Sequence, residues 1–143
     1  MFILKHQDGD IKYIFERGGF AIVESKLYLS IETKASIEDA FLDSYLFAID
    51  SYFLLNNQLE NSIIQIATNP NDEPSNVYVY TKFHACDVEA EISIDAVSYT
   101  EITVSINLIS EDVNYYDDNA KRNLFVGVVN LNRCALEKIW IPS

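Results

Sequence analysis

The chain has 143 residues, of which 22 are Asp or Glu and 10 are Lys or Arg, so its net charge is −12. This length fits a single domain, residues 1–143, and the 49% hydrophobic and 13% aromatic content is that of a globular chain, not of a disordered acidic tail. A negative field of this strength disfavours binding to nucleic acids and anionic membranes, and it favours basic protein partners.

The sequence carries no sign of export or membrane insertion. Lys5 interrupts the N-terminal apolar run far short of the length that a secretory signal needs. The chain also lacks the roughly 20 uncharged residues of a membrane span. Cys86 and Cys134 are too few for a disulfide scaffold and fit reduced thiols. We therefore expect a cytoplasmic protein.

The first 32 residues predict short antiparallel strands at 2–6, 11–15, 20–24 and 27–32. The Asp8-Gly9 pair between two apolar runs is a strong hairpin signal, because glycine accepts the positive φ that a type I′ turn requires. Gly18 and Gly19 predict a second turn in the same way. This part of the chain is expected to be a meander.

From Ser36 the spacing of apolar residues becomes helical and predicts one long helix over about residues 37–56. One side of that helix would carry three aspartates within a narrow arc, Asp39, Asp43 and Asp50. Strands before and after a single helix indicate an α+β domain, in which antiparallel sheets pack on the helix.

After the helix, a period of two residues returns and predicts strands at 62–68, 77–83, 124–131 and 136–142. The segments 86–94 and 100–108 alternate apolar and polar residues and should form a hairpin around Asp95–Tyr99. One face of this hairpin would be core. The other would be polar and would carry four carboxylates, Asp87, Glu89, Glu91 and Glu101.

The stretch VNYYDDN, residues 113–119, mixes two tyrosines with two aspartates in an expected loop. Tyr115 and Tyr116 would supply rigid contact area, and Asp117 and Asp118 would pair with Lys or Arg of a partner. A solvated polar turn accounts for the same residues. The likeness to the Tyr-x-Asp-Asp sequence of reverse transcriptases covers four residues, and we reject it because such short matches have a high false-positive rate.

No motif indicates catalysis, a cofactor or a metal. His84 and Cys86 are two possible ligands on one strand face, which is too few for a zinc site. Glycine-rich phosphate loops and nucleophile motifs are lacking. We therefore predict no catalytic, cofactor-binding or metal-binding residues, and a protein that is not an enzyme.

The acidic side chains concentrate in the middle of the chain, since residues 35–120 hold 16 acids and one base, Lys82. In size, acidity and aromatic content the chain resembles the immunity proteins with which bacteria neutralise their own toxins. That resemblance implies an inhibitor that occludes a basic, nuclease-like toxin. The expected contact residues are Asp39, Asp43, Asp50, Asp87, Glu89, Glu91, Glu101, Tyr115, Tyr116, Asp117 and Asp118.

Three alternatives remain open on the sequence. A small-ligand-binding domain or enzyme would have a sheet-lined pocket with convergent polar groups. A structural subunit would self-associate, for example through Phe47, Phe53 and Leu54. Finally, an acidic surface can simply keep a protein in solution.

Overall fold

A computed structural model describes residues 1–6, 9–36, 46–54, 63–68, 77–80, 88–110 and 123–139. Within these ranges the chain is almost entirely β-structure, with a short 3-10 helix, η1, at Leu136–Lys138. The strands are β1 (Phe2–His6), β2 (Gly9–Val23), β3 (Lys26–Ala35), β4 (Leu46–Phe53), β5 (Ile63–Thr68), β6 (Val77–Tyr80), β7 (Val88–Ala96), β8 (Glu101–Ser110) and β9 (Asn123–Asn132). No helix in these ranges has the length and apolar character needed to cross a bilayer.

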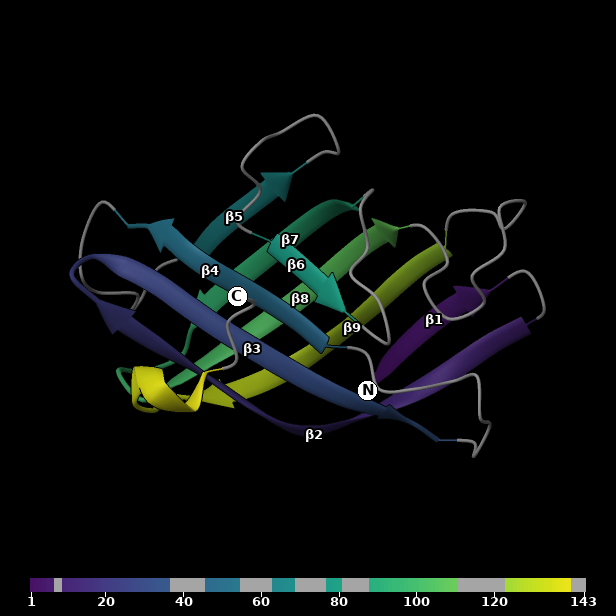
Figure 1. Cartoon of the computed structure of the whole chain (residues 1–143), viewed down its shortest axis with the longest axis horizontal. Helices are drawn as coiled ribbons and strands as arrows, with labels where there is room; N and C mark the ends of the chain where they lie inside the picture. Colours follow the sequence, from purple (N-terminus) through teal and green to yellow (C-terminus); the bar gives the residue numbers. More distant parts are fainter. Residues whose placement is uncertain are drawn as a thin grey trace.

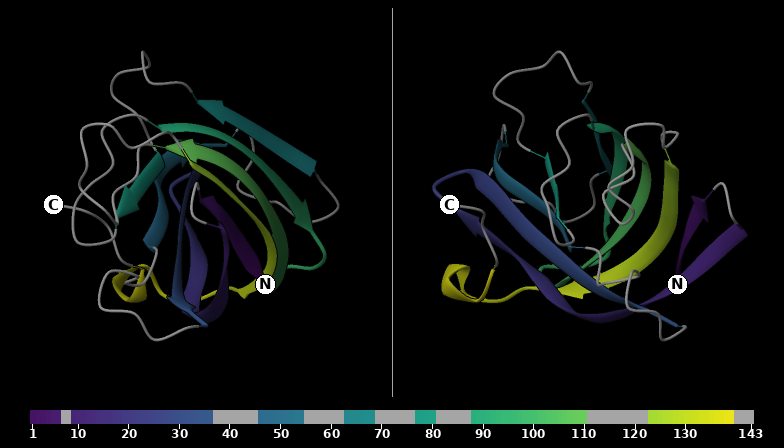
Figure 2. Two further views of the ribbon diagram at one scale, coloured as in Figure 1. Left: turned by 90° about the vertical axis from the view of Figure 1, so that its right-hand side faces the viewer. Right: turned by 45° about the vertical axis from the view of Figure 1, so that its right-hand side comes forward.

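The strands form one antiparallel sheet in the order β5-β7-β8-β9-β1-β2-β3-β4-β6 (Figure 1). The sheet curls into a half-barrel, and β6 near one end of the order comes to lie against β7 near the other (Figure 2). Sheets twist and curl because each strand has an intrinsic right-handed twist. The inner face of the curled sheet holds the hydrophobic core.

The expectation of an α+β fold with a helix at 37–56 is wrong, because residues Leu46–Phe53 form β4. Within β4, Phe47 and Ile49 face the core, and Ala48 is also fully buried although it pairs with Ser30 on the opposite face. A strand buried on both faces loses its polar-apolar alternation, so its apolar run imitates a buried helix. The N-terminal part of the expected helix, residues 37–45, lies outside the described residues.

The expected turn at Gly18 and Gly19 is also wrong, because β2 runs without a break from Gly9 to Val23. Its ladder to β3 is irregular between Phe15 and Arg17, which bends the strand at this point. The chain reverses instead at Glu24 and Ser25, whose φ angles of 51° and 65° fit a type I′ turn. At the C-terminal end, the strand expected at 136–142 is replaced over Leu136–Lys138 by η1.

The short strand β1 lies between β2 and β9 and joins the two parts of the sheet. Phe2 is fully buried, and its ring stacks on Phe125 with 5.3 Å between centroids. Tyr13 meets the same Phe125 ring edge to face at 5.7 Å. Phe2 pairs with Gly127 across the ladder, and its ring occupies the space that a Cβ on Gly127 would need. The absence of a side chain at Gly127 therefore leaves room for the Phe2 ring in the core.

Beyond the N-terminal end of β1, strands β2 and β9 approach one another directly. Phe20 and Arg133 form a parallel bridge, and the amide of Cys134 donates a hydrogen bond of 2.8 Å to the Phe20 carbonyl. The approach depends on Gly19, because a Cβ there would lie 2.7 Å from Sγ of Cys134. The segment from Arg133 to Ile139 is thereby held against the outer face of the sheet.

Candidate functional site

The hairpin expected around Asp95–Tyr99 is confirmed as β7 and β8, paired from Val88↔Ser110 to Ala96↔Ile102. The apolar residues of both strands are buried in the core, including Ile92 and Val104. The residues between these buried ones therefore point outward, because successive side chains of a strand lie on opposite faces. We define the acidic face as the four carboxylate residues at these outward positions, Glu89, Glu91, Asp95 and Glu101.

The backbone ladder holds the acidic face in a defined arrangement. Glu91 pairs with Asn107, and Asp95 pairs with Thr103 across the hairpin. The Thr103 hydroxyl then donates a 2.8 Å hydrogen bond to Oδ1 of Asn130 on β9. Glu91 and Asp95 are exposed, whereas Glu89 and Glu101 are half-buried. The carboxylates are thus presented on a rigid sheet flanked by neutral polar groups.

Most described positive charge lies away from this surface, and the exception is Arg133, which follows the Glu101 partner Asn132 and donates from Nε to the Tyr99 carbonyl at 2.9 Å. In the part of the chain that the structure describes, Lys and Arg residues occur on β1, β2 and β3 and in the segment after β9, and none occurs on β5, β7, β8 or β9. Glu91 and Asp95 form no ion pair with a described residue, so their charges keep a strong local negative potential. The acidic face is therefore suited to attract cationic groups.

The predicted contact residues fall into three groups in the structure. Glu89, Glu91 and Glu101 lie together on the acidic face, as expected. Asp50 lies on β4, distant from them in the strand order, and its side chain is outside the described residues. The remaining predicted residues lie outside the described ranges, namely Asp39, Asp43, Asp87, Tyr115, Tyr116, Asp117 and Asp118.

Sequence reasoning missed Asp95 as a member of the acidic face, because it assigned this residue to the turn. The alternation of buried residues in fact continues through Ile94 to Ala96, with Asp95 on the opposite face. Continuing the two-residue period by one more step would have placed Asp95 beside Glu91 and Glu89 on the sequence alone.

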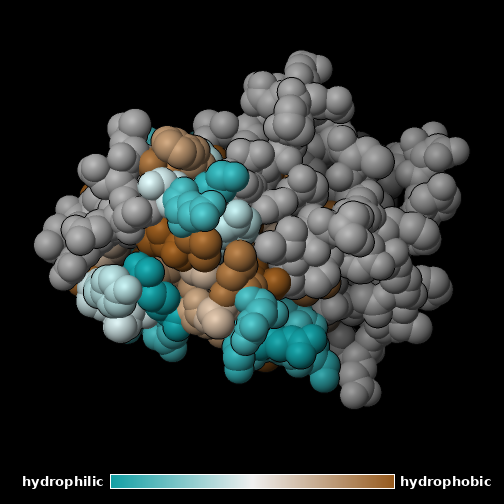
Figure 3. All heavy atoms as spheres, turned by 60° about the vertical axis from the view of Figure 1, so that its left-hand side comes forward, coloured by the Kyte–Doolittle hydropathy of each residue, from teal (hydrophilic) through white to brown (hydrophobic). Residues whose placement is uncertain are grey.

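A second candidate surface is apolar and lies where β2, β3 and β4 end. Val23 pairs with Lys26, and Lys26 pairs with Phe53, so two exposed apolar side chains flank one lysine on neighbouring strands. Seen from this side of the molecule, the described surface shows apolar area bordered by hydrophilic residues (Figure 3). The area is compatible with a contact surface, but it brings no chemically reactive groups together.

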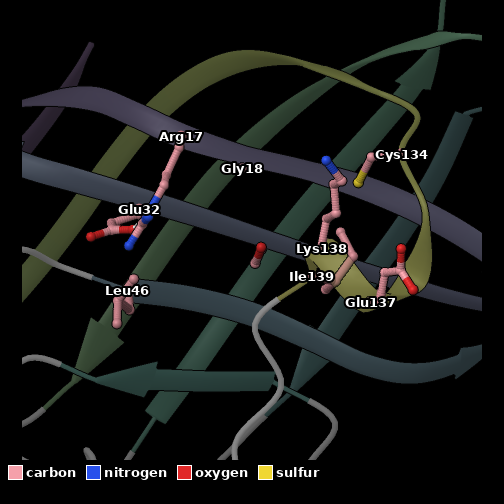
Figure 4. A pocket seen from close by; sticks show the side chains of 9 residues that line it. Arg17, Gly18, Glu32, Leu46, Cys134, Glu137, Lys138 and Ile139 are labelled. Carbon is pink, nitrogen blue, oxygen red and sulfur yellow. Dashed lines mark hydrogen bonds and ion pairs between the residues drawn. The ribbon is translucent and has the colours of Figure 1, made fainter.

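A third candidate is a groove on the outer side of the sheet, with a volume of about 630 Å³. One side is formed by Arg17, Glu32 and Leu46, and the other by the C-terminal segment with Lys138 and Ile139 (Figure 4). Nε of Arg17 donates to Oε2 of Glu32, and this contact raises the pKa of the guanidinium above its usual value. The groove joins charged groups of both signs to apolar side chains.

Cys134 also lines this groove and carries a free thiol. Burial raises the pKa of the thiol, and the positive charge of Lys138 partly opposes that effect. A raised pKa lowers the thiolate fraction at neutral pH, and the thiolate is the nucleophilic form. Cys134 therefore does not have the character of an activated nucleophile.

Nothing in the described part of the chain assembles a metal centre, since no three His, Cys, Asp or Glu residues there are grouped to hold an ion. The acidic face and the groove thus remain the two arrangements with a definite chemical character. In comparisons with known proteins, no family model, no curated protein and no solved structure matches this chain.

Proposed function

We propose that this protein is a binding protein whose acidic face docks on a basic partner and occludes it, in the manner of an immunity protein acting on a toxin. The observation that carries the proposal is the row of outward carboxylates on β7 and β8, with Lys and Arg confined to other described parts of the sheet.

The physical argument rests on charge complementarity. Side chains on one strand face recur every two residues, which is about 6.6 Å along the strand. Glu89 and Glu91 have this spacing, whereas Ser93 separates Glu91 from Asp95. Phosphates on one strand of DNA recur about every 3.4 Å. The acidic face therefore suits individual Lys and Arg side chains better than it imitates a whole nucleic-acid duplex. Such contacts accelerate association and weaken as salt increases.

The chemistry of the described groups supports a binding role more than a catalytic one. Glu91 and Asp95 are exposed to solvent, and water around a reacting group weakens the electrostatic interactions on which catalysis depends. A rigid exposed surface is suited to docking because little conformational entropy is lost when it binds.

The test compares the parent protein with two variants of equal net charge. The face variant carries Glu91→Lys, Asp95→Lys and Glu101→Lys, which changes the net charge from −12 to −12 + 6 = −6. The control variant reverses three other carboxylates, Asp10, Glu16 and Glu24, and also reaches −6. Each protein is immobilised, exposed to native lysate at low salt and eluted with a salt gradient.

We expect the parent and the control variant to retain one basic protein that salt releases, and the face variant to lose it. Recombination of the eluted protein with the parent should suppress any nuclease or other toxic activity that it carries. Equal retention by the face variant would refute the assignment of the acidic face. Failure of the parent to retain a basic protein would count against the inhibitor function itself.

A further inference from the structure

We infer that the groove between the outer face of β2–β4 and the C-terminal segment binds a small zwitterion of the α-amino acid type. The inference does not depend on the proposed inhibitor function, because the groove shares no residue with the acidic face.

The first observation is a buried hydroxyl group in the groove that no described residue hydrogen-bonds. Ser30 lines it, has only 6% of its surface exposed, and its hydroxyl has no hydrogen-bond partner in the described part of the chain. Buried hydroxyl groups are normally hydrogen-bonded, because a buried polar group without a partner loses the hydrogen bonds that it made to water. A ligand group at this position would satisfy Ser30.

The second observation is a carboxylate on the same strand face as this hydroxyl. Ser30 and Glu32 lie two residues apart on the same face of β3, a separation of about 6.6 Å. The Glu32 side chain is 20% exposed, and Arg17 contacts its Oε2 atom. Its Oε1 atom accepts no hydrogen bond from any described residue. This oxygen and the Ser30 hydroxyl are two acceptors on one face of β3, and an ammonium group is a donor suited to either.

The third observation is a cation on the other side of the groove. Lys138 lines that side and forms no ion pair with a described residue. Its ammonium group fits a carboxylate of the ligand. Arg17 and Lys138 balance Glu32 and Glu137, so the charged lining residues have a net charge of zero. A purely anionic or cationic ligand would leave a like charge opposed, whereas a zwitterion matches both signs.

The fourth observation is apolar area beside the charged groups. Leu46 is half-buried on one side of the groove, and Ile139 is buried on the other. Both residues line the groove and provide contact area for an aliphatic side chain. The volume of about 630 Å³ lies within the usual range for small-molecule sites. These four features together select an amino acid with an aliphatic side chain.

The test uses four probes that share the leucine side chain: leucine carries both charges, leucinamide only the positive one, N-acetylleucine only the negative one, and N-acetylleucinamide neither. Binding to the full chain is measured by isothermal titration calorimetry and by NMR shifts of Ser30, Glu32 and Lys138. Leucine should bind about tenfold more tightly than each singly charged probe, because each lost charge removes one charge-assisted hydrogen bond. The uncharged probe should bind most weakly.

Two variants assign the two ends of the ligand, and a third is the control. Glu32→Gln should remove the advantage of leucine over N-acetylleucine, and Lys138→Met should remove its advantage over leucinamide. Lys34→Met is the control, since Lys34 is exposed on β3 and does not line the groove. Thermal melting of each variant verifies folding. Absence of leucine binding, equal binding of all four probes, or a control variant as impaired as Lys138→Met would overturn the inference.

Discussion

Phe2→Ala provides a direct test of the register of β1. Phe2 is fully buried, stacked on Phe125 and seated over Gly127, so its removal leaves a cavity in the centre of the core. Phenylalanine-to-alanine changes at such sites cost about 3–5 kcal/mol. At about 2–4 °C per kcal/mol for a domain near this size, the melting temperature should fall by roughly 10 °C.

The matched control is Ile3→Ala on the adjacent residue. Ile3 is half-buried and lies on the opposite face of β1, because successive strand residues alternate between faces. The Ile3→Ala substitution should lower the free energy of unfolding by less than about 1 kcal/mol, as substitutions of partly exposed residues usually do. Urea unfolding followed by tryptophan fluorescence and far-UV circular dichroism gives both free energies of unfolding.

A double-mutant cycle sharpens the test. Phe2→Ala, Phe125→Ala and the double variant should show a coupling energy of about 0.5–1.5 kcal/mol, as expected for an aromatic pair. If β1 were shifted by one residue relative to its neighbours, its inward-facing side chains would point outward and its outward-facing side chains would point inward. If Ile3→Ala costs as much as Phe2→Ala, or if the cycle shows no coupling, the described register is wrong.

Three further changes probe other parts of the fold. Ser25→Gly should stabilise the protein by about 0.5–1 kcal/mol, because glycine adopts the positive φ of this turn without strain; an unchanged or lower melting temperature would contradict the turn. Gly19→Ala should destabilise it by about 1–3 kcal/mol through a clash with the sulfur of Cys134, and a Cys134→Ala background should recover part of that loss. In a Cys86→Ser background, alkylation of Cys134 should have a pH midpoint above about 8.5, the value for a free cysteine. Lys138→Met should slow alkylation further at pH 8, since it removes the charge that favours the thiolate; faster reaction would show that Lys138 does not act on the thiol.

The sequence predicted β-structure well where one strand face is buried and the other is polar. The alternation in β7 and β8 is regular because their outer face remains in contact with water, so the hairpin and three of its carboxylates could be predicted. The same reasoning failed for β4, because Ala48 on its outer face is as buried as Phe47 on its inner face. Local periodicity does not report burial that arises from packing between distant segments.

The turns and the groove show the same limit. Gly18 and Gly19 suggested a turn of the chain. Position 19 instead requires glycine because Cys134, more than a hundred residues later, packs against it. A sheet-lined pocket was one of the alternatives, but the residues of the groove were not predicted, since the docking of the C-terminal segment brings Lys138 to the groove that Glu32 lines. Neither residue belongs to a motif. Turns and grooves of this kind can be predicted from the sequence only when the contacts between distant segments are known.

The position of β1 between β2 and β9 has a consequence for folding kinetics. The pair Phe2↔Gly127 joins residues separated by 127 − 2 = 125 positions. The other residue pairs between β1 and β9 are separated by a similar number of positions. Such pairings have a high contact order. The chain must first lose the entropy of closing a long loop, and only then do the contacts between the two strands stabilise it. The two parts of the sheet can form from nearer neighbours, β2 with β3 and β7 with β8. Joining them through β1 should therefore be the slow step, and folding should take milliseconds to seconds, as is usual for all-β domains.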